Sequence, residues 1–516
     1  MKRVFLDHWN RITDVCWHSK LAQSFILQLQ EWFNSRRLRF LIIAVALLST
    51  ILSLQAYAPA DGADGTDYFM HAAYLAGYDV PATFEAHPPI YPILILLFFF
   101  QTDQIYILIA VQLILSIAQP LILFEALRPH SLPLAVITSL VVTLDMQTRI
   151  LFNFVSTEPI YIFLMSATFS LAIFQMEKSE QRMLGDTLLA ILIVLTGLTR
   201  SVGLYLIVPF GFVFLLKTRS LKRLIILLLA YFVGSQIFNF AYQNIFQLER
   251  VTANTESESL LMQPIMRSGL AVAENGPATS EIFNILSTCD DVPPYSPCII
   301  EAKGSRQSAN RLIRDAYVEL VTTHPISYLQ DVLKNITSFL RLSSLQYTGD
   351  SPSVAQCIGV QERTDRNFER YLTVDVATRG DIVVNERVFY DILLYTTKQM
   401  CPPLSENETV REIVDWIAFR YRSIARPQPW LWMIALVFFM ISLPFARKFW
   451  AFALLAMMLN VYHATISAAL YNIQPRYAAV TNVFRVVIIM TTLYILMQFF
   501  LHIFDYWQSR RERSLS

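Results

Sequence analysis

The sequence predicts an all-α polytopic membrane protein, with about ten transmembrane helices and one large extracytoplasmic loop domain. Hydrophobic residues make up 54% of the 516 residues and charged residues only 16%, whereas soluble domains carry roughly 25% charged residues. The apolar residues fall in long uncharged runs, which reach across a bilayer at about 1.5 Å per helical residue. Such a chain cannot bury its apolar surface in one aqueous core.

Ten apolar runs give the predicted crossings and divide the chain. The runs are 38–58, 104–127, 132–150, 159–176, 186–199, 202–217, 223–246, 429–446, 449–470 and 481–504. A shorter run at 89–101 is interpreted as a re-entrant or interfacial helix. The predicted parts are a cytoplasmic amphipathic N-terminus (1–37), an N-terminal transmembrane module (38–246) with its first outer loop at 59–103, an extracytoplasmic loop domain (247–429), C-terminal transmembrane helices (430–504) and a cytoplasmic tail (505–516).

Basic residues indicate the orientation of these crossings. Arginine and lysine gather in alternate connections, at 128–131, 177–185, 217–223, 446–448 and in the tail. The other connections hold few basic residues, notably Arg149, Arg200 and Arg476. The positive-inside rule therefore places both termini in the cytoplasm, in a bacterial inner membrane or, in a eukaryote, the ER membrane. The formal net charge of +1 gives no bulk basic surface for nucleic acid.

The loop domain is predicted to be α-rich, with an α+β arrangement as the alternative. Residues 308–343 have helical apolar spacing that His324-Pro325 interrupts, which predicts two amphipathic helices on the outer leaflet. In an oxidising compartment the cysteines of this domain would pair, and sequence proximity favours 289–298 and 357–401, with four reduced thiols as the alternative. These disulfide candidates are Cys289, Cys298, Cys357 and Cys401. No cysteine or histidine spacing indicates a zinc module.

Charged residues at the membrane edge are costly to place there, so each is a candidate for function. The candidates on the predicted outer side are Asp61, Asp64, Asp67, Glu85, Glu158, Arg200, Arg476 and, further into its helix, Arg485, for which packing or lipid contact is expected. A carboxylate can remove the proton from an acceptor hydroxyl. Arginines can hold a phosphate and stabilise the charge that it gains as a leaving group. These outer-side carboxylates and arginines are therefore suited to transferring a group from a phosphate-linked donor to an acceptor hydroxyl.

The first outer loop carries a family resemblance. It contains Asp64-Gly65-Thr66-Asp67-Tyr68 and, further on, His87-Pro88-Pro89-Ile90-Tyr91-Pro92. This loop resembles that of GT-C membrane glycosyltransferases, and within them the bacterial glycosyltransferase 39/83-type relatives of protein O-mannosyltransferases and of the lipid A aminoarabinose transferase. The resemblance implies a GT-C-like bundle, with Asp64 as catalytic base and with Tyr68 and His87 in support. Many relatives have Asp-Glu where this chain has Asp64-Gly65, so Asp67 remains a competing base.

Three later segments match the same pattern. Ser156-Thr157-Glu158-Pro159 resembles the acidic turn of the second outer loop, and Thr199-Arg200-Ser201-Val202-Gly203 resembles the arginine-and-glycine turn before the sixth helix. Gln474-Pro475-Arg476-Tyr477 resembles the late Arg-Tyr motif that binds the carrier phosphate. By this resemblance Glu158 joins the catalytic acids, while Arg200, Arg476 and Tyr477 bind the substrate phosphate.

Residues and resemblance together predict an inverting glycosyltransferase of glycan or cell-envelope biosynthesis. It would move a hexose or pentose from a polyprenyl-phosphate-sugar in the bilayer to a hydroxyl of a lipid, glycan or protein acceptor. No cofactor is predicted to be required, and dependence on a divalent metal is left open. The alternatives are a transporter or flippase of a lipid-linked or anionic substrate, and a non-catalytic membrane assembly subunit. The acids could also be turn formers among glycines, and the arginines could snorkel to headgroups.

Overall fold

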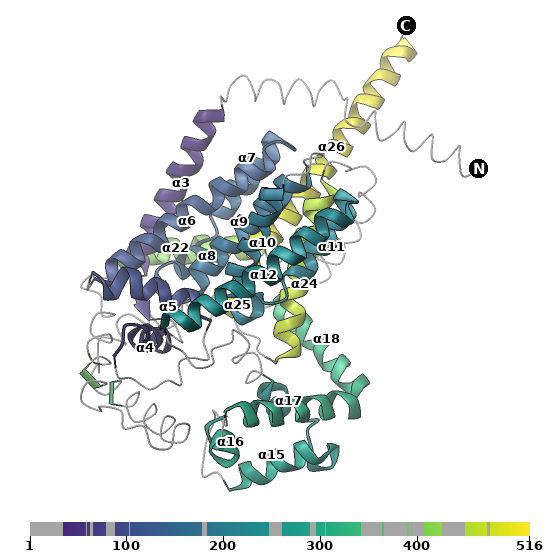
Figure 1. Cartoon of the computed structure of the whole chain (residues 1–516). Helices are drawn as coiled ribbons and strands as arrows, with labels where there is room; N and C mark the ends of the chain where they lie inside the picture. Colours follow the sequence, from purple (N-terminus) through teal and green to yellow (C-terminus); the bar gives the residue numbers. More distant parts are fainter. Residues whose placement is uncertain are drawn as a thin grey trace.

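The fold is that of a helical membrane protein, seen here in a computed structural model of the chain (Figure 1). The structure describes residues 35–57, 59–61, 65–78, 88–102, 104–177, 183–246, 261–288, 296–304, 306–341, 364–365, 390–391, 394, 407–425, 449–471 and 475–515. Helices form nearly all of the regular structure in these ranges, and the strands there are two short pieces, β1 (Ala60–Asp61) and β2 (Phe154–Val155).

Seven helices in the described ranges are long and apolar enough to cross a membrane. They lie in α3 (Ser35–Ala56), α6 (Ile105–Leu127), α9 (Glu158–Met176), η3 with α11 (Ser201–Gly203 and Ile207–Thr218), α12 (Leu221–Phe246), α24 (Trp450–Ala469) and α26 (Asn482–Leu515). Three shorter apolar helices accompany them, namely α5 with η2 (Ile90–Ile95 and Leu96–Phe100), α7 (Leu132–Thr143) and α10 (Met183–Gly197). The predicted polytopic membrane fold is confirmed, whereas the predicted crossing at 429–446 lies outside the described residues.

One predicted crossing is broken. The sequence predicts a continuous helix over 132–150, but α7 stops at Thr143 and a second helix, α8 (Met146–Leu151), begins after Asp145. Asp145 caps α8 by accepting a hydrogen bond from the backbone N–H of Thr148 at 3.4 Å. Arg149, expected in an outer connection, is instead almost wholly buried, and its Nη1 donates to the Ser116 hydroxyl at 2.5 Å. The turn at 144–145 is not apparent from the sequence, because the polar residues of this run find hydrogen-bond partners inside the bundle instead of in water.

The two ends of the bundle differ in the elements that they contain. One end, the strand rim, contains β1, β2, the turn at 198–204, residues 470–471 at the end of α24, and α25 (Pro475–Val480). There β1 and β2 pair in parallel, with Ala60 opposite Phe154. The Asn153 amide donates to the backbone carbonyls of Ser53 and Tyr57, at 3.0 and 2.8 Å. These bonds tie the first connection of the chain to the connection that precedes α9.

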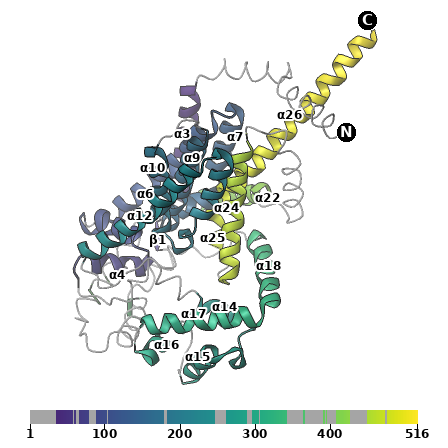
Figure 2. The same cartoon turned by 45° about the vertical axis from the view of Figure 1, so that its right-hand side comes forward.

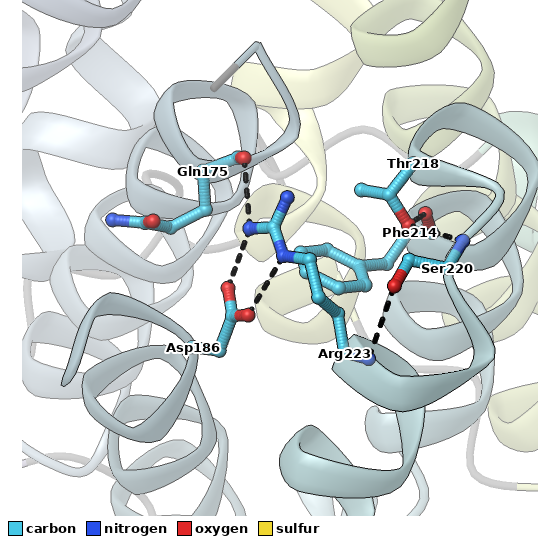
Figure 3. Close-up of polar contacts among 6 residues, drawn as sticks. All are labelled: Gln175, Asp186, Phe214, Thr218, Ser220 and Arg223. Carbon is cyan, nitrogen blue, oxygen red and sulfur yellow. Dashed lines mark hydrogen bonds and ion pairs between the residues drawn. The ribbon is translucent and has the colours of Figure 1, made fainter. Parts of the chain in front are cut away.

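The opposite end, the arginine rim, holds the beginnings of α3, α10 and α12. Its ion pairs join neighbouring helices, as in Arg39–Glu125 at 2.5 Å and Lys217–Glu177 at 2.9 Å. Figure 3 shows the most enclosed pair, in which Arg223 of α12 binds both carboxylate oxygens of Asp186 on α10. The sequence placed Arg223 in a basic connection; in the structure it lies in the first turn of α12, and its side chain is only 4% exposed.

A second helical layer lies beyond the strand rim, at the far end of the molecule from the C-terminus (Figure 1). It consists of α14 (Met262–Arg267), η4 (Ala273–Asn275), α15 (Pro277–Ser287), α16 (Ser296–Lys303) and α17 (Arg306–Thr323), with α18 (Pro325–Arg341) connecting it to the bundle (Figure 2). The predicted break at His324-Pro325 is confirmed. The layer has its own apolar core around Ile265, Ile282 and Ile313.

The connecting helix α18 is fixed to the end of α24. The Tyr328 hydroxyl donates to the backbone carbonyl of Ala469 at 2.7 Å, and the Tyr471 hydroxyl donates to the Asp331 carboxylate at 3.0 Å. Burial, followed by the hydrogen bond to Asp331, raises the pKa of Tyr471, so its phenol stays protonated and remains a donor. Of the predicted disulfide cysteines only Cys298, on α16, falls within the described residues, and the pairings stay predictions.

Candidate functional site

Three residues predicted from separate parts of the chain meet at the strand rim. Arg200 Nη1 lies 2.8 Å from Glu158 Oε1. The guanidinium carbon of Arg200 also lies 4.2 Å from the ring centroid of Tyr477, within cation–π range. The site therefore combines a carboxylate, a guanidinium and an aromatic face that are 42 residues or more apart in sequence.

Glu158 is placed by the strand that precedes it. The chain leaves β2 at Val155 and begins α9 at Glu158, with Pro159 in the first helical turn, where proline has no N–H to lose. A carboxylate in this turn is favoured by the helix dipole. Only 2% of the Glu158 side chain is exposed, so its charge depends on the partner guanidinium. The geometry gives Glu158 the position of a group that holds Arg200.

Arg200 is placed by a turn that folds tightly against the end of α10. A Cβ atom added to Gly203 would lie 2.8 Å from the carbonyl oxygen of Thr196 and 2.9 Å from the Cα of Gly197. Both are backbone atoms, so a side chain at position 203 would force the turn outward. The Tyr462 hydroxyl also donates to the carbonyl of Val202 at 2.5 Å, which anchors the turn to α24. Glycine here allows the close approach that directs Arg200 at Glu158.

Tyr477 belongs to α25 (Pro475–Val480), the short helix between α24 and α26. Its side chain is half-buried, beside Phe339 of α18 and two small residues, Ala464 and Ala478. The backbone of Arg476 is part of the same helix, while its side chain lies outside the described residues. The predicted Arg-Tyr motif is thus at the strand rim, and the phosphate-binding role of Arg476 stays a prediction.

Two site neighbours were missed from the sequence. The Tyr161 hydroxyl and His463 Nε2 are 3.2 Å apart, and Arg200 lies 5.9 Å from the Tyr161 ring. Both side chains are buried. Tyr161 follows Glu158 by three residues, so it shares a helix face with it. His463 is an ionisable residue inside an apolar run, a signal that could have identified it.

Arg485 lies deeper, on α26. It is fully buried, and its Nε donates to the side-chain oxygen of Asn460 at 3.3 Å, while the Phe339 ring lies 5.9 Å from its guanidinium carbon. The lipid contact considered for Arg485 is therefore wrong, since the side chain points into the bundle. Asn460 and His463 are one turn apart on α24, so a band of polar side chains continues inward from the strand rim.

The first predicted outer loop is described in part. Asp64 and His87 lie outside the described residues, so their roles stay predictions. Asp67 lies half-buried in the first turn of α4 (Gly65–Leu75). Tyr68 is buried, with its ring centroid 5.4 Å from that of Tyr91 in an edge-on contact, and its supporting role stays a prediction.

This loop is also tied to the strand rim. Asp61 pairs with Val155 in the small sheet, and Val155 lies three residues before Glu158. On the other side of the loop, His71 Nε2 lies 2.7 Å from the Tyr242 hydroxyl of α12. The acidic segment of the loop thus begins next to the strand that leads to Glu158.

The chemistry available at this rim is that of anion recognition. Both side chains are largely buried, with 10% of Arg200 and 2% of Glu158 exposed, so Arg200 is the less enclosed member of the pair. A planar guanidinium can bind a phosphate through two parallel hydrogen bonds. Among the described residues, no three His, Cys, Asp or Glu side chains are grouped so as to hold a metal ion.

Comparisons with known proteins return no match to a protein-family model and none to a curated protein sequence. Solved structures similar to this chain include ArnT from Cupriavidus metallidurans in the apo state, which is 12% identical with a TM-score of 0.31, over 88% of this chain and 76% of that one. The same protein bound to undecaprenyl phosphate gives 13% identity and a TM-score of 0.30, over 88% of this chain and 77% of that one.

An Archaeoglobus fulgidus oligosaccharyltransferase tethered with an acceptor peptide gives 12% identity and a TM-score of 0.29, over 81% of this chain and 55% of that one. ArnT and this oligosaccharyltransferase are GT-C fold glycosyltransferases, the class that the sequence motifs resemble.

Proposed function

We propose that this chain is an integral-membrane glycosyltransferase that takes its sugar from a polyprenyl-phosphate-linked donor. The observation that carries the proposal is the meeting of Glu158, Arg200 and Tyr477 at one rim of the bundle. A guanidinium fixed by a buried carboxylate and an aromatic face is suited to a phosphate that arrives at the membrane surface on a lipid. By the positive-inside rule, the strand rim would face the extracytoplasmic side.

The proposed reaction is an inverting displacement. The acceptor hydroxyl oxygen forms a bond to the anomeric carbon, and the bond from that carbon to the phosphate oxygen breaks. The phosphate leaves with the electron pair, and its added charge is stabilised by Arg200 and Arg476. The hydroxyl proton passes to a carboxylate of the first outer loop, for which Asp64 is the first candidate and Asp67 the second.

Glu158 and Tyr477 would act on the arginine. Glu158 fixes the direction of the Arg200 guanidinium, and Tyr477 covers one of its faces, so that the hydrogen-bonding edge is held in place before the donor binds. Positioning of this kind lowers the barrier because no reorganisation is needed during the reaction. The helical layer formed by α14–α17 lies beyond the same rim, where it would shape the acceptor site (Figure 2).

The test is donor turnover by the purified full-length chain in lipid nanodiscs. A panel of polyprenyl-phosphate hexoses and pentoses would be supplied with a lipid and glycan extract as acceptor, and free polyprenyl phosphate would be followed by mass spectrometry. We expect turnover with at least one donor, a loss of about 100-fold or more for Asp64→Asn, and near wild-type turnover for Asp61→Asn, the matched loop acid.

Two results would contradict the proposal. If Asp64→Asn and Asp67→Asn each turn over like the wild type, the assigned base is wrong. If no donor is consumed and the protein instead carries a lipid-linked sugar across the bilayer of proteoliposomes, the flippase alternative replaces the enzyme.

A further inference from the structure

Two connections that carry site residues are joined by a hydrogen bond inside the bundle. The Nδ2 of Asn482 donates to Oδ2 of Asp145 at 2.9 Å. Asp145 is 2% exposed and Asn482 is 1% exposed, so neither group is solvated at this point. The two residues are 337 positions apart in the sequence, and each stands at the beginning of a helix.

Asp145 belongs to the segment that delivers Glu158. It precedes α8, whose N-terminus it caps through the backbone N–H of Thr148. It also accepts a hydrogen bond from the Thr148 hydroxyl. From α8 the chain passes through Asn153, held by the carbonyls of Ser53 and Tyr57, into β2. This segment is fixed at both ends, so Asp145 is a rigid attachment point.

Asn482 belongs to the segment that delivers Tyr477. It is the first residue of α26 and follows α25 after one turn residue, Thr481, whose N–H and hydroxyl both donate to the carbonyl of Ala478. The short helix α25 packs against α8 and α9. A shift of Asn482 would therefore move α25, and with it the Arg476–Tyr477 pair, relative to Arg200.

We propose that the Asp145–Asn482 hydrogen bond is a positioning contact that holds α25 against the second outer connection and so sets the affinity of the site for a polyprenyl phosphate. This inference rests on the proposed function for its ligand, and it adds two residues that touch neither donor nor acceptor. Asp145 is the acceptor and Asn482 the donor of the contact. A carboxylate suits this place because it can accept from Thr148 and Asn482 together.

The test measures the affinity of the purified chain for undecaprenyl phosphate, titrated in nanodiscs and followed by native mass spectrometry well below the melting temperature. Asn482→Ala leaves the α8 cap in place and removes the Asp145–Asn482 hydrogen bond, and we expect about tenfold weaker binding. Asn482→Asp sets two carboxylates against each other and should weaken binding further.

Adding Asp145→Asn to Asn482→Asp reverses donor and acceptor, and we expect the affinity to return to within about threefold of wild type. Thr492→Ala is the control, because its hydroxyl donates to the carbonyl of Ile488 within the same helix and should leave binding unchanged. If the contact served folding alone, the Asn482 variants would yield less folded protein. The affinity of the folded fraction would then be unchanged in the single variants and in the exchange variant.

Two results would overturn the inference, namely wild-type affinity in folded Asn482→Ala, or an exchange variant that folds and still binds weakly. If Asn482→Ala does not fold, the affinity of the exchange variant for undecaprenyl phosphate is the deciding measurement. Wild-type protein that does not bind undecaprenyl phosphate also overturns it. Wild-type protein that binds the lipid but transfers no sugar would contradict the proposed function and leave this inference standing.

Discussion

The two rims of the bundle each hold a buried arginine–carboxylate pair, and the pairs are built differently. At the arginine rim, Arg223 binds both oxygens of Asp186, at 2.7 and 2.8 Å, and donates a third bond to the carbonyl of Gln175 at 3.1 Å. At the strand rim, Arg200 contacts Glu158 at 2.8 Å through Nη1 and places its face on Tyr477.

The difference indicates two purposes. Asp186 is fully enclosed and the Phe214 ring lies 4.8 Å from the Arg223 guanidinium carbon, so this pair closes the contact between α10 and α12 (Figure 3). The pair at the strand rim joins the first residue of α9 to the turn after α10, and Arg200 is its less enclosed member. The Asp186–Arg223 pair therefore joins two helices, whereas the Glu158–Arg200 pair holds the arginine for which we propose phosphate binding. Variants at the two rims would separate these roles.

The largest effect is expected at the structural pair. Asp186→Asn leaves Arg223 buried without its counter-charge, which should lower the free energy of unfolding by about 3–5 kcal/mol. Turnover per folded molecule should be close to wild type. The measurements are unfolding in a detergent titration and donor turnover of the folded fraction.

A paired replacement is the control. Asp186→Leu combined with Arg223→Met removes both charges and should recover most of the lost stability, because buried ion pairs are often replaceable by apolar residues of similar volume. If Asp186→Asn unfolds like the wild type, the pair does not join the helices as described.

The second effect concerns Arg200. Arg200→Lys keeps the charge but loses the planar fork and the stacking on Tyr477, so we expect turnover to fall by about 100-fold, with a melting temperature within a few degrees of wild type. Arg223→Lys at the other rim is the matched variant, for which stability should fall and turnover per folded molecule should not. If Arg200→Lys lowers stability and Arg223→Lys lowers turnover instead, the roles assigned to the two pairs are wrong.

A smaller effect is expected at the turn that directs Arg200. Gly203→Ala puts a Cβ 2.8 Å from a backbone carbonyl and 2.9 Å from a backbone Cα, so the turn must move, at about 1–3 kcal/mol of stability. Turnover should fall because Arg200 moves with the turn. Gly234→Ala is the control, since its Cβ would meet Val194 Cγ2 at an ordinary 3.7 Å. Equal turnover in both variants would show that the turn does not control the site.

The smallest effect lies in the helical layer. The Glu319 carboxylate accepts from the N–H groups of Ala278 and Thr279 at 3.0 and 2.8 Å. Burial alone would raise the pKa of Glu319, but these bonds and one from the Thr279 hydroxyl hold it below its ordinary value of 4.5. A lowered pKa stabilises the layer above that ordinary value, and this contribution is lost as the pH falls through the lowered pKa.

We therefore expect Glu319→Gln to cost about 1 kcal/mol at pH 7, after allowing for partial exposure of the carboxylate. The difference from wild type should shrink towards zero as the pH falls below 4.5. Thermal unfolding across a pH series would measure it, and a difference that does not change with pH would contradict the assignment.

Much of the fold and part of the candidate site could be predicted from the sequence. The apolar runs located the long helices, and the break at His324-Pro325 followed from a proline that cannot continue a helix. The motifs identified Glu158, Arg200 and Tyr477, which the structure brings together. The break at Asp145 and the burial of Arg149 could not be predicted, because polar residues that are satisfied by distant partners look like any others in the sequence.

The amino-acid sequence by itself determined that this chain enters a membrane, because its long uncharged apolar stretches could not all be buried inside one water-soluble core. It also placed Glu158 and Arg200 at the ends of helices. Tertiary structure alone decided which arginine joins two helices through Asp186 and which meets Glu158 and Tyr477 at the strand rim. It also decided that Asp145 meets Asn482. These outcomes depend on contacts across hundreds of residues, and the energy of a buried charge is set by the partner that it finds there.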